Sequence, residues 1–173
     1  MAIVTKTVQI PATEVLSTGH SITNPENMFT GLDSETYASI RITYAGTGNS
    51  QRTVLGGFDF SVIPDDATID SFDGYVKCNV EQDIGSTLPS VILGTYSTSQ
   101  TAVSFTGISE VQTLKAWKSS SLPFSTDLKV VIGGSCESYN TGHINVYGVV
   151  IEVTYTAFEP DTHGIFNLIL PRG

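Results

Sequence analysis

Residues 144–155 constrain the fold more than any other part of the chain. They run Ile-Asn-Val-Tyr-Gly-Val-Val-Ile-Glu-Val-Thr-Tyr, a composition rich in the β-branched and aromatic residues that favour a strand. Successive side chains of a strand point to opposite faces, so the pattern predicts one large apolar face and one smaller, partly polar face. The large face comprises Tyr147, Val149, Ile151, Val153 and Tyr155. The rest of the chain is expected to supply strands that close over it.

Similar alternation predicts further strands along the chain, separated by turn residues and without a helical period. These strands cover residues 4–10, 37–44, 54–62, 69–80, 91–96, 102–105 and 128–132. Their spacing predicts an all-β fold, an antiparallel β-sandwich of jelly-roll-like type. The predicted single core contains Phe58, Phe60, Phe72, Val76, Tyr147, Val149, Ile151 and Val153.

Some predictions are finer. Ile40, Ile42 and Tyr44 are expected to share one face of their strand, and Val62 to point inward with Phe58 and Phe60. Residues 19–32 are expected to form a loop and residues 45–50 a turn. Gly133 and Gly134 are expected to end the strand that precedes them. Residues 111–117 fit either one helical turn or a loop.

The C-terminal segment departs from this pattern, so we divide the chain into a sandwich domain, residues 1–156, and a C-terminal extension or arm, residues 157–173. The apolar run 165–170 is either a last strand of the same sheet or an arm docked on a neighbouring subunit. Leaving a large apolar side chain in water forfeits roughly 1.5–3 kcal/mol. We therefore predict a homo-oligomer, a trimer, with Phe166, Leu168 and Leu170 at or near a subunit contact.

Charge and composition exclude several partners. The formal net charge is −9, which disfavours nucleic acid and anionic membrane surfaces, since both attract basic proteins. The apolar runs are much shorter than the roughly 20 residues of a membrane span. The first residues lack the pattern of a secretory signal, so we expect a cytoplasmic origin. Charged residues are only 14% of the chain, which suits packing against copies or partners, although a threonine-rich β domain has the same composition.

The sequence offers little that resembles an active site. Ser135 and Cys136 with His143 downstream resemble a nucleophile beside a base, but also fit a turn that carries a buried thiol. Cys78 and Cys136 are expected to be free in a reducing compartment. The three histidines, at 20, 143 and 163, are not spaced as zinc ligands. The sequence also has no glycine-rich phosphate-binding loop. We therefore predict no enzymatic activity and no cofactor.

Acidic turns and aromatic residues leave two binding hypotheses open. Calcium binds carboxylates in loops, but aspartate is also common in turns because its side chain bonds the local backbone. The candidates are Asp33, Glu35, Asp65, Asp66 and Asp70, and we predict no bound metal. A carbohydrate would bind through exposed rings, for which Tyr75, Tyr96, Trp117 and Tyr139 are the candidates.

Three segments in order carry a resemblance to a known module. They are Asn-Pro-Glu-Asn at 24–27 followed by Leu-Asp-Ser-Glu-Thr-Tyr-Ala at 32–38, Leu-Gly-Gly-Phe-Asp-Phe at 55–60 with the proline turn at 63–69, and the strand 144–155. Together they resemble a β-sandwich module of tailed-bacteriophage structural proteins. The resemblance covers residues 24–155, with Trp117 near a tryptophan of the module. The chain departs from it at Ser21 and Ile22, where the module usually has a tryptophan.

The resemblance implies a role in a virion. We expect a non-enzymatic structural protein, a capsid decoration or head-fibre subunit, assembled in the host bacterial cytoplasm. Its partners would be copies of itself and other virion proteins such as the major capsid protein. The alternative is a tail component or a receptor-binding module that binds carbohydrate.

Overall fold

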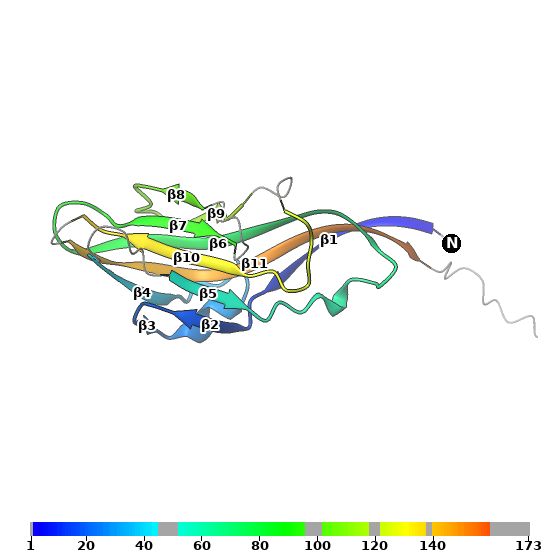
Figure 1. Cartoon of the computed structure of the whole chain (residues 1–173), viewed down its shortest axis with the longest axis horizontal. Helices are drawn as coiled ribbons and strands as arrows, with labels where there is room; N and C mark the ends of the chain where they lie inside the picture. Colours follow the sequence, from blue (N-terminus) through cyan, green and yellow to red (C-terminus); the bar gives the residue numbers. More distant parts are fainter. Residues whose placement is uncertain (1, 45–51, 96–101, 118–121, 138–139, 160–173) are drawn as a thin grey trace, which may run out of the picture.

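The computed structural model describes residues 2–44, 52–95, 102–117, 122–137 and 140–159. Their regular structure is almost entirely β-strand, in two antiparallel sheets that pack face to face (Figure 1). The predicted β-sandwich is confirmed. None of the helical segments in these ranges is long and apolar enough to cross a membrane.

The larger sheet has six strands built around β11. Its order is β3-β4-β11-β6-β9, and β1 also pairs with β11. β6 follows one edge of β11, while β4 and β1 share the other edge, at residues 141–146 and 150–159. The strands are β1 (Ala2–Pro11), β3 (Ile22–Thr23), β4 (Ala38–Thr43), β6 (Thr68–Ile84), β9 (Gln112–Lys115) and β11 (Thr141–Glu159).

The smaller sheet has five short strands in the order β2-β5-β10-β7-β8. They are β2 (Glu14–Thr18), β5 (Arg52–Gly56), β7 (Ser90–Gly94), β8 (Val103–Phe105) and β10 (Val130–Ser135). Two 3-10 turns complete the fold, η1 (Pro25–Phe29) and η2 (Phe60–Val62).

The core lies between the sheets and contains seven of the eight side chains predicted for it. Phe58, Phe60, Phe72, Val76, Val149, Ile151 and Val153 are all buried. Trp117 is also buried and lies over Gly74, where a Cβ would come within 2.3 Å of the indole. The glycine therefore makes room for the tryptophan in the middle of β6.

Tyr147, the eighth predicted core residue, is outside the core. The register between β11 and β6 shifts between Val146 and Gly148, and such a bulge adds a residue and reverses the facing of everything beyond it. Ile144 and Val146 are therefore buried before the bulge, as Val149 is after it. Alternation alone could not show this reversal.

The strand predicted over residues 54–62 is shorter than expected. β5 ends at Gly56, and Gly57 has a φ of 70°, a left-handed conformation that breaks an extended strand. Phe58 and Phe60 still point inward, but Val62 is 56% exposed. Tyr44 is likewise exposed, at 46%, although Ile40 and Ile42 are buried as predicted.

Four shorter predictions need correction or completion. The segment 111–117 contains strand β9, not a helical turn or a simple loop. Gly133 and Gly134 lie within β10 and do not end it. The predicted loop 19–32 contains β3 and η1, and β2 was not predicted. The turn predicted at 45–50 lies outside the described residues.

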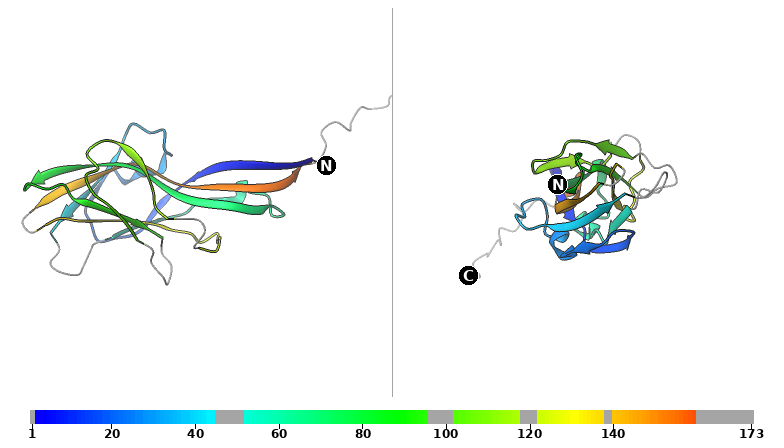
Figure 2. Two further views of the ribbon diagram at one scale, coloured as in Figure 1. Left: turned by 90° about the horizontal axis from the view of Figure 1, so that it is seen from above. Right: turned by 90° about the vertical axis from the view of Figure 1, so that its left-hand side faces the viewer.

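A three-stranded ribbon projects from the sandwich body (Figure 2). It consists of β1, the C-terminal half of β11 and the N-terminal part of β6, and we call it the ribbon. β11 continues through Glu159, past the predicted domain boundary at residue 156. Residues 160–173 lie outside the described ranges.

Candidate functional site

The free end of the ribbon, which we call the tip, brings the two ends of the described chain together. Ala2 of β1 lies opposite Glu159 of β11, and the next pair is Ile3 with Phe158. Ile3 is 69% exposed and Phe158 is 55% exposed. The tip therefore presents a pair of large apolar side chains to solvent, at the point where residues 160–173 begin.

Behind this pair, one face of the ribbon carries a ladder of hydroxyl groups. The hydroxyls of Thr7 and Thr154 lie 2.9 Å apart, and those of Thr5 and Thr156 lie 3.0 Å apart. Thr156 donates its hydroxyl to Asp70 at 2.7 Å, so Thr5 is the donor to Thr156. These cross-strand bonds make the face polar without adding charge.

Lys6 and Glu159 form an ion pair on the opposite face of the ribbon. Both side chains are about half exposed. The hydrogen bond to Glu159, together with its negative charge, raises the pKa of Lys6 above its ordinary value. β1 thus carries one cationic side chain, and that charge is balanced within the ribbon.

The body side of the ribbon is packed by aromatic rings that extend the core toward the tip. Phe124 lies edge-on to Phe60 at 5.3 Å and to Phe72 at 5.4 Å between ring centroids. Beside them is an open pocket of about 310 Å³, whose lining includes Ile63 and Ile69. The pocket walls are mostly apolar, so it suits an apolar side chain better than a polar substrate.

The predicted oligomer-contact residues, Phe166, Leu168 and Leu170, lie outside the described residues. The described part of the chain ends at Glu159 of β11, at the tip of the ribbon. Their predicted role at a subunit contact therefore stays a prediction.

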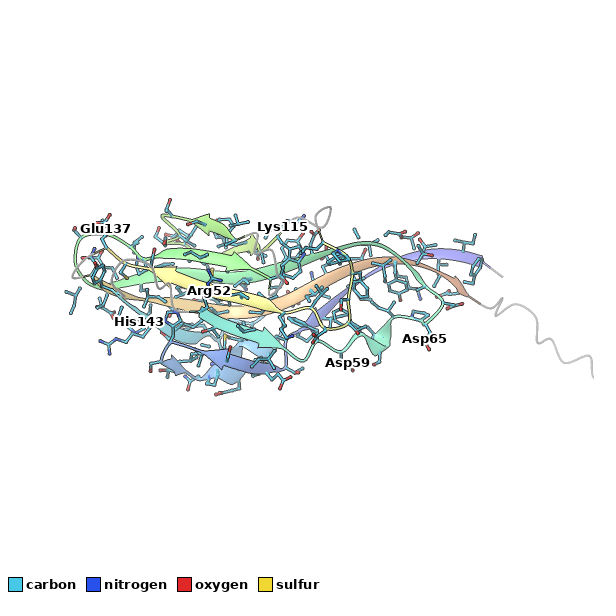
Figure 3. All side chains as sticks on the ribbon, in the orientation of Figure 1. Arg52, Asp59, Asp65, Lys115, Glu137 and His143 are labelled. Atoms are coloured by element: carbon cyan, nitrogen blue, oxygen red, sulfur yellow. The ribbon has the colours of Figure 1, made fainter. Side chains whose placement is uncertain are left out.

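The residues that resembled a nucleophile and a base have other partners. The Ser135 hydroxyl lies 2.7 Å from that of Ser90, and the Cys136 thiol donates to the carbonyl of Ile42 at 3.7 Å. His143 lies on the body, at the end away from the ribbon tip (Figure 3), and its Nδ1 lies 3.0 Å from Asp83. Burial and the charge of Asp83 raise the pKa of Cys136, which disfavours the thiolate that catalysis needs.

The candidate metal ligands do not converge in the described ranges. No group of three His, Cys, Asp or Glu side chains there could hold a metal ion. His20 pairs with the carbonyl of Arg41 at 3.1 Å, and Asp70 accepts from Thr156. Cys78 and Cys136 are free thiols, and burial raises the pKa of Cys78 to about 12.

The described residues include two of the four aromatic residues proposed for carbohydrate binding, Trp117 and Tyr75. Trp117 is only 1% exposed and is a core residue, which removes it from that set. Tyr75 is half-buried, and Tyr96 and Tyr139 lie outside the described residues.

Sequence reasoning missed another aromatic pair. Tyr37 and Tyr147 lie 5.2 Å apart between ring centroids, with the Lys77 ammonium 5.7 Å from the Tyr147 ring. The ammonium also donates to the carbonyls of Leu32 and Ser34. The bulge in β11 turns Tyr147 outward, and no sequence pattern marked that bulge.

Comparisons with known proteins identify no family. No family of protein sequences and no curated protein matches the chain. Among solved structures, it is similar to a family two carbohydrate esterase from Cellvibrio japonicus, with 11% identity and a TM-score of 0.38. The match covers 92% of this chain and 36% of that one, so the chain spans little more than a third of that protein.

Proposed function

We propose that the protein is a non-enzymatic structural component of a tailed-bacteriophage virion, a capsid decoration or head-fibre subunit. It self-associates as a trimer and attaches to other virion proteins such as the major capsid protein. The observation that carries the proposal is the division into a body and a projecting ribbon, with both ends of the described chain and the exposed pair Ile3 and Phe158 at one tip. The resemblance to phage sandwich modules supports the same role.

The tip is the attachment end in this proposal. Covering Ile3 and Phe158 would recover part of the roughly 1.5–3 kcal/mol that each large apolar side chain gains on burial. The apolar run 165–170 begins after only residues 160–164. Apolar pockets such as the one beside Ile69 are suitable surfaces for it on a neighbouring subunit.

Two features of the described residues support a non-enzymatic role. The Cys136 thiol has a raised pKa, and its hydrogen bond goes to a backbone carbonyl. His143 pairs with Asp83 at the surface of the body, not with a nucleophile. General-base catalysis needs the base within hydrogen-bond reach of the group it activates.

Electron microscopy of virions that carry a labelled copy of the protein tests the proposal. We expect the label on the capsid, with the ribbon tip toward the shell and the body outward. The matched variant lacks residues 161–173, and it should fold but lose trimer mass and capsid occupancy. Absence of the label from purified virions would refute the virion role, and an unfolded truncated chain would show that the tail belongs to the core.

A carbohydrate-binding tail module is the second candidate, favoured by the exposed ring of Tyr37 beside Tyr147. A glycan array with the full chain separates the two functions. Specific sugar binding that Tyr37→Ala abolishes, while Tyr44→Ala does not, would favour the tail module. Tyr44 is the matched control because it is also exposed, at 46%, and lies at the opposite end of the same segment.

A further inference from the structure

One edge of β1 has no strand partner among the residues that the structure describes. Among the described residues β1 pairs with β11 alone, over ten residues and without a register shift. Figure 2 shows it as the outermost strand along the length of the ribbon. An edge strand presents a row of free backbone N–H and C=O groups, which is a template for another strand.

The other edge strands of the two sheets are protected in the usual ways. β3, β8 and β9 have two, three and four residues, and very short edges offer few hydrogen bonds. β2 has five residues and is interrupted by a register shift between Val15 and Ser17. The ribbon's other edge, residues 68–73 of β6, also has β11 as its one strand partner among the described residues, but it is shorter and carries Asp70 and Asp73, and charged side chains discourage edge pairing. β1 differs from the other edges because it is long and regular and carries one charged side chain, Lys6.

The side chains of β1 do not block its edge either. Proline and lysine are the residues that usually discourage edge pairing. Pro11 stands only at the body end of the strand, and Lys6 is neutralised by Glu159. The threonine and valine residues of β1, between its two ends, favour strand pairing. Lys6 is the one charged side chain along residues 2–8, and it repels a second strand only in a register that places it opposite another positive charge.

We infer that two copies of the protein pair through β1, antiparallel about a two-fold axis, and merge their ribbons into one six-stranded sheet. The inference goes beyond the proposed function: this dimer is a separate assembly from the shell-bound trimer, because its two tips point in opposite directions, and it does not depend on placement in a virion. A second copy is favoured as the occupant because the edge is self-complementary. In an antiparallel pair, opposite residues share a face, so the two-fold axis must pass through a residue that lies opposite itself.

The axis passes through Thr5. Centring on Lys6 would put like charges opposite each other, which is destabilising. Centring on Thr7 would bring Ala2 against Ala12, which is fully buried and whose amide is bonded to Val149. Centring on Thr5 pairs residues 2–8, with Ile3 opposite Thr7 and Val4 opposite Lys6 of the second copy.

Disulfide crosslinking tests this register. Opposite residues of antiparallel strands have Cα atoms about 4.5–5.5 Å apart, within the range for a disulfide. In a full-length Cys136→Ser background, Thr5→Cys should form a covalent dimer on mild oxidation. Gln9→Cys, which lies beyond the paired residues on the same face, should not. Equal crosslinking of both variants, or none, would overturn the inference.

Sedimentation analysis gives an independent measurement. Thr5→Lys opposes two charges across the axis and should weaken association by up to about fivefold. Thr154→Lys loses an equivalent hydroxyl bond on β11 and should associate like the unmodified chain. Because residues 161–173 take no part in the pairing of β1 with β1, their removal should leave the Thr5→Cys crosslink intact. A monomer whose β1 amides are all protected from hydrogen exchange would show that the chain covers its own edge.

Discussion

Replacing Ile151 by alanine tests the core assignment most directly. Ile151 is fully buried and lies between Ile10 of β1 and Gly74 of β6. The substitution removes three carbons, worth about 0.8 kcal/mol each on transfer, and leaves a cavity. Gly74 has no side chain to fill it, and the backbone is held by strands on both sides. We expect the loss of unfolding free energy to fall in the upper part of the usual range, about 3–5 kcal/mol.

Urea unfolding followed by the fluorescence of Trp117 measures this loss. Trp117 is the one tryptophan of the chain and is 1% exposed, so unfolding should shift its emission to longer wavelength. The control is Thr154→Ala, on the opposite face of the same strand, which loses one exposed hydroxyl bond. A loss below about 0.5 kcal/mol for Ile151→Ala, within the range of ordinary surface substitutions, would refute the face assignment of β11.

Two further predictions use the same assay. Gly148→Ala should lower the free energy of unfolding by about 1–3 kcal/mol, because the new Cβ would lie 2.1 Å from the carbonyl oxygen of Gly31. The control is Gly107→Ala, whose new Cβ meets no atom within 4 Å and whose cost comes from the φ of 70° at that position. Equal losses of stability in the two variants would contradict the close approach at Gly148. Cys78 should stay protonated in the folded protein while the unfolded thiol ionises near its ordinary pKa of 9.0. Stability should therefore be full below about pH 9 and decline toward the folded pKa of about 12, and a Cys78→Ala variant with the same decline would contradict this.

The sequence predicted the sandwich because most of its strands alternate cleanly. Val76, Ile151 and Val153 are buried as their period indicates. Alternation predicted the wrong facing of side chains where the backbone departs from an ideal strand, at the bulge beside Tyr147 and after Gly57. Phe58 and Phe60 were placed correctly in the core for a different reason, because large aromatic side chains are buried whether or not their backbone is extended.

Short strands escaped prediction because their side chains barely alternate in burial. β9 buries only Leu114 and β2 only partly buries Val15, so tertiary pairing defines them more than local pattern does. The ribbon itself was not predicted, although its strands were. Its projection depends on β6 and β11 being much longer than the strands of the opposite sheet, and the predicted ends of both strands fell short of the real ones.

The pairing of Ala2 with Glu159 at the ribbon tip has a mechanical consequence. A force that separates Ala2 from Glu159 acts across the β1–β11 ladder and opens it one hydrogen-bonded pair at a time, like a zipper. A force that pulls the tip away from the body runs along both strands, is carried by their covalent backbones, and does not separate these pairs. A ribbon held by its tip therefore resists tension along its axis far better than splaying of its two ends.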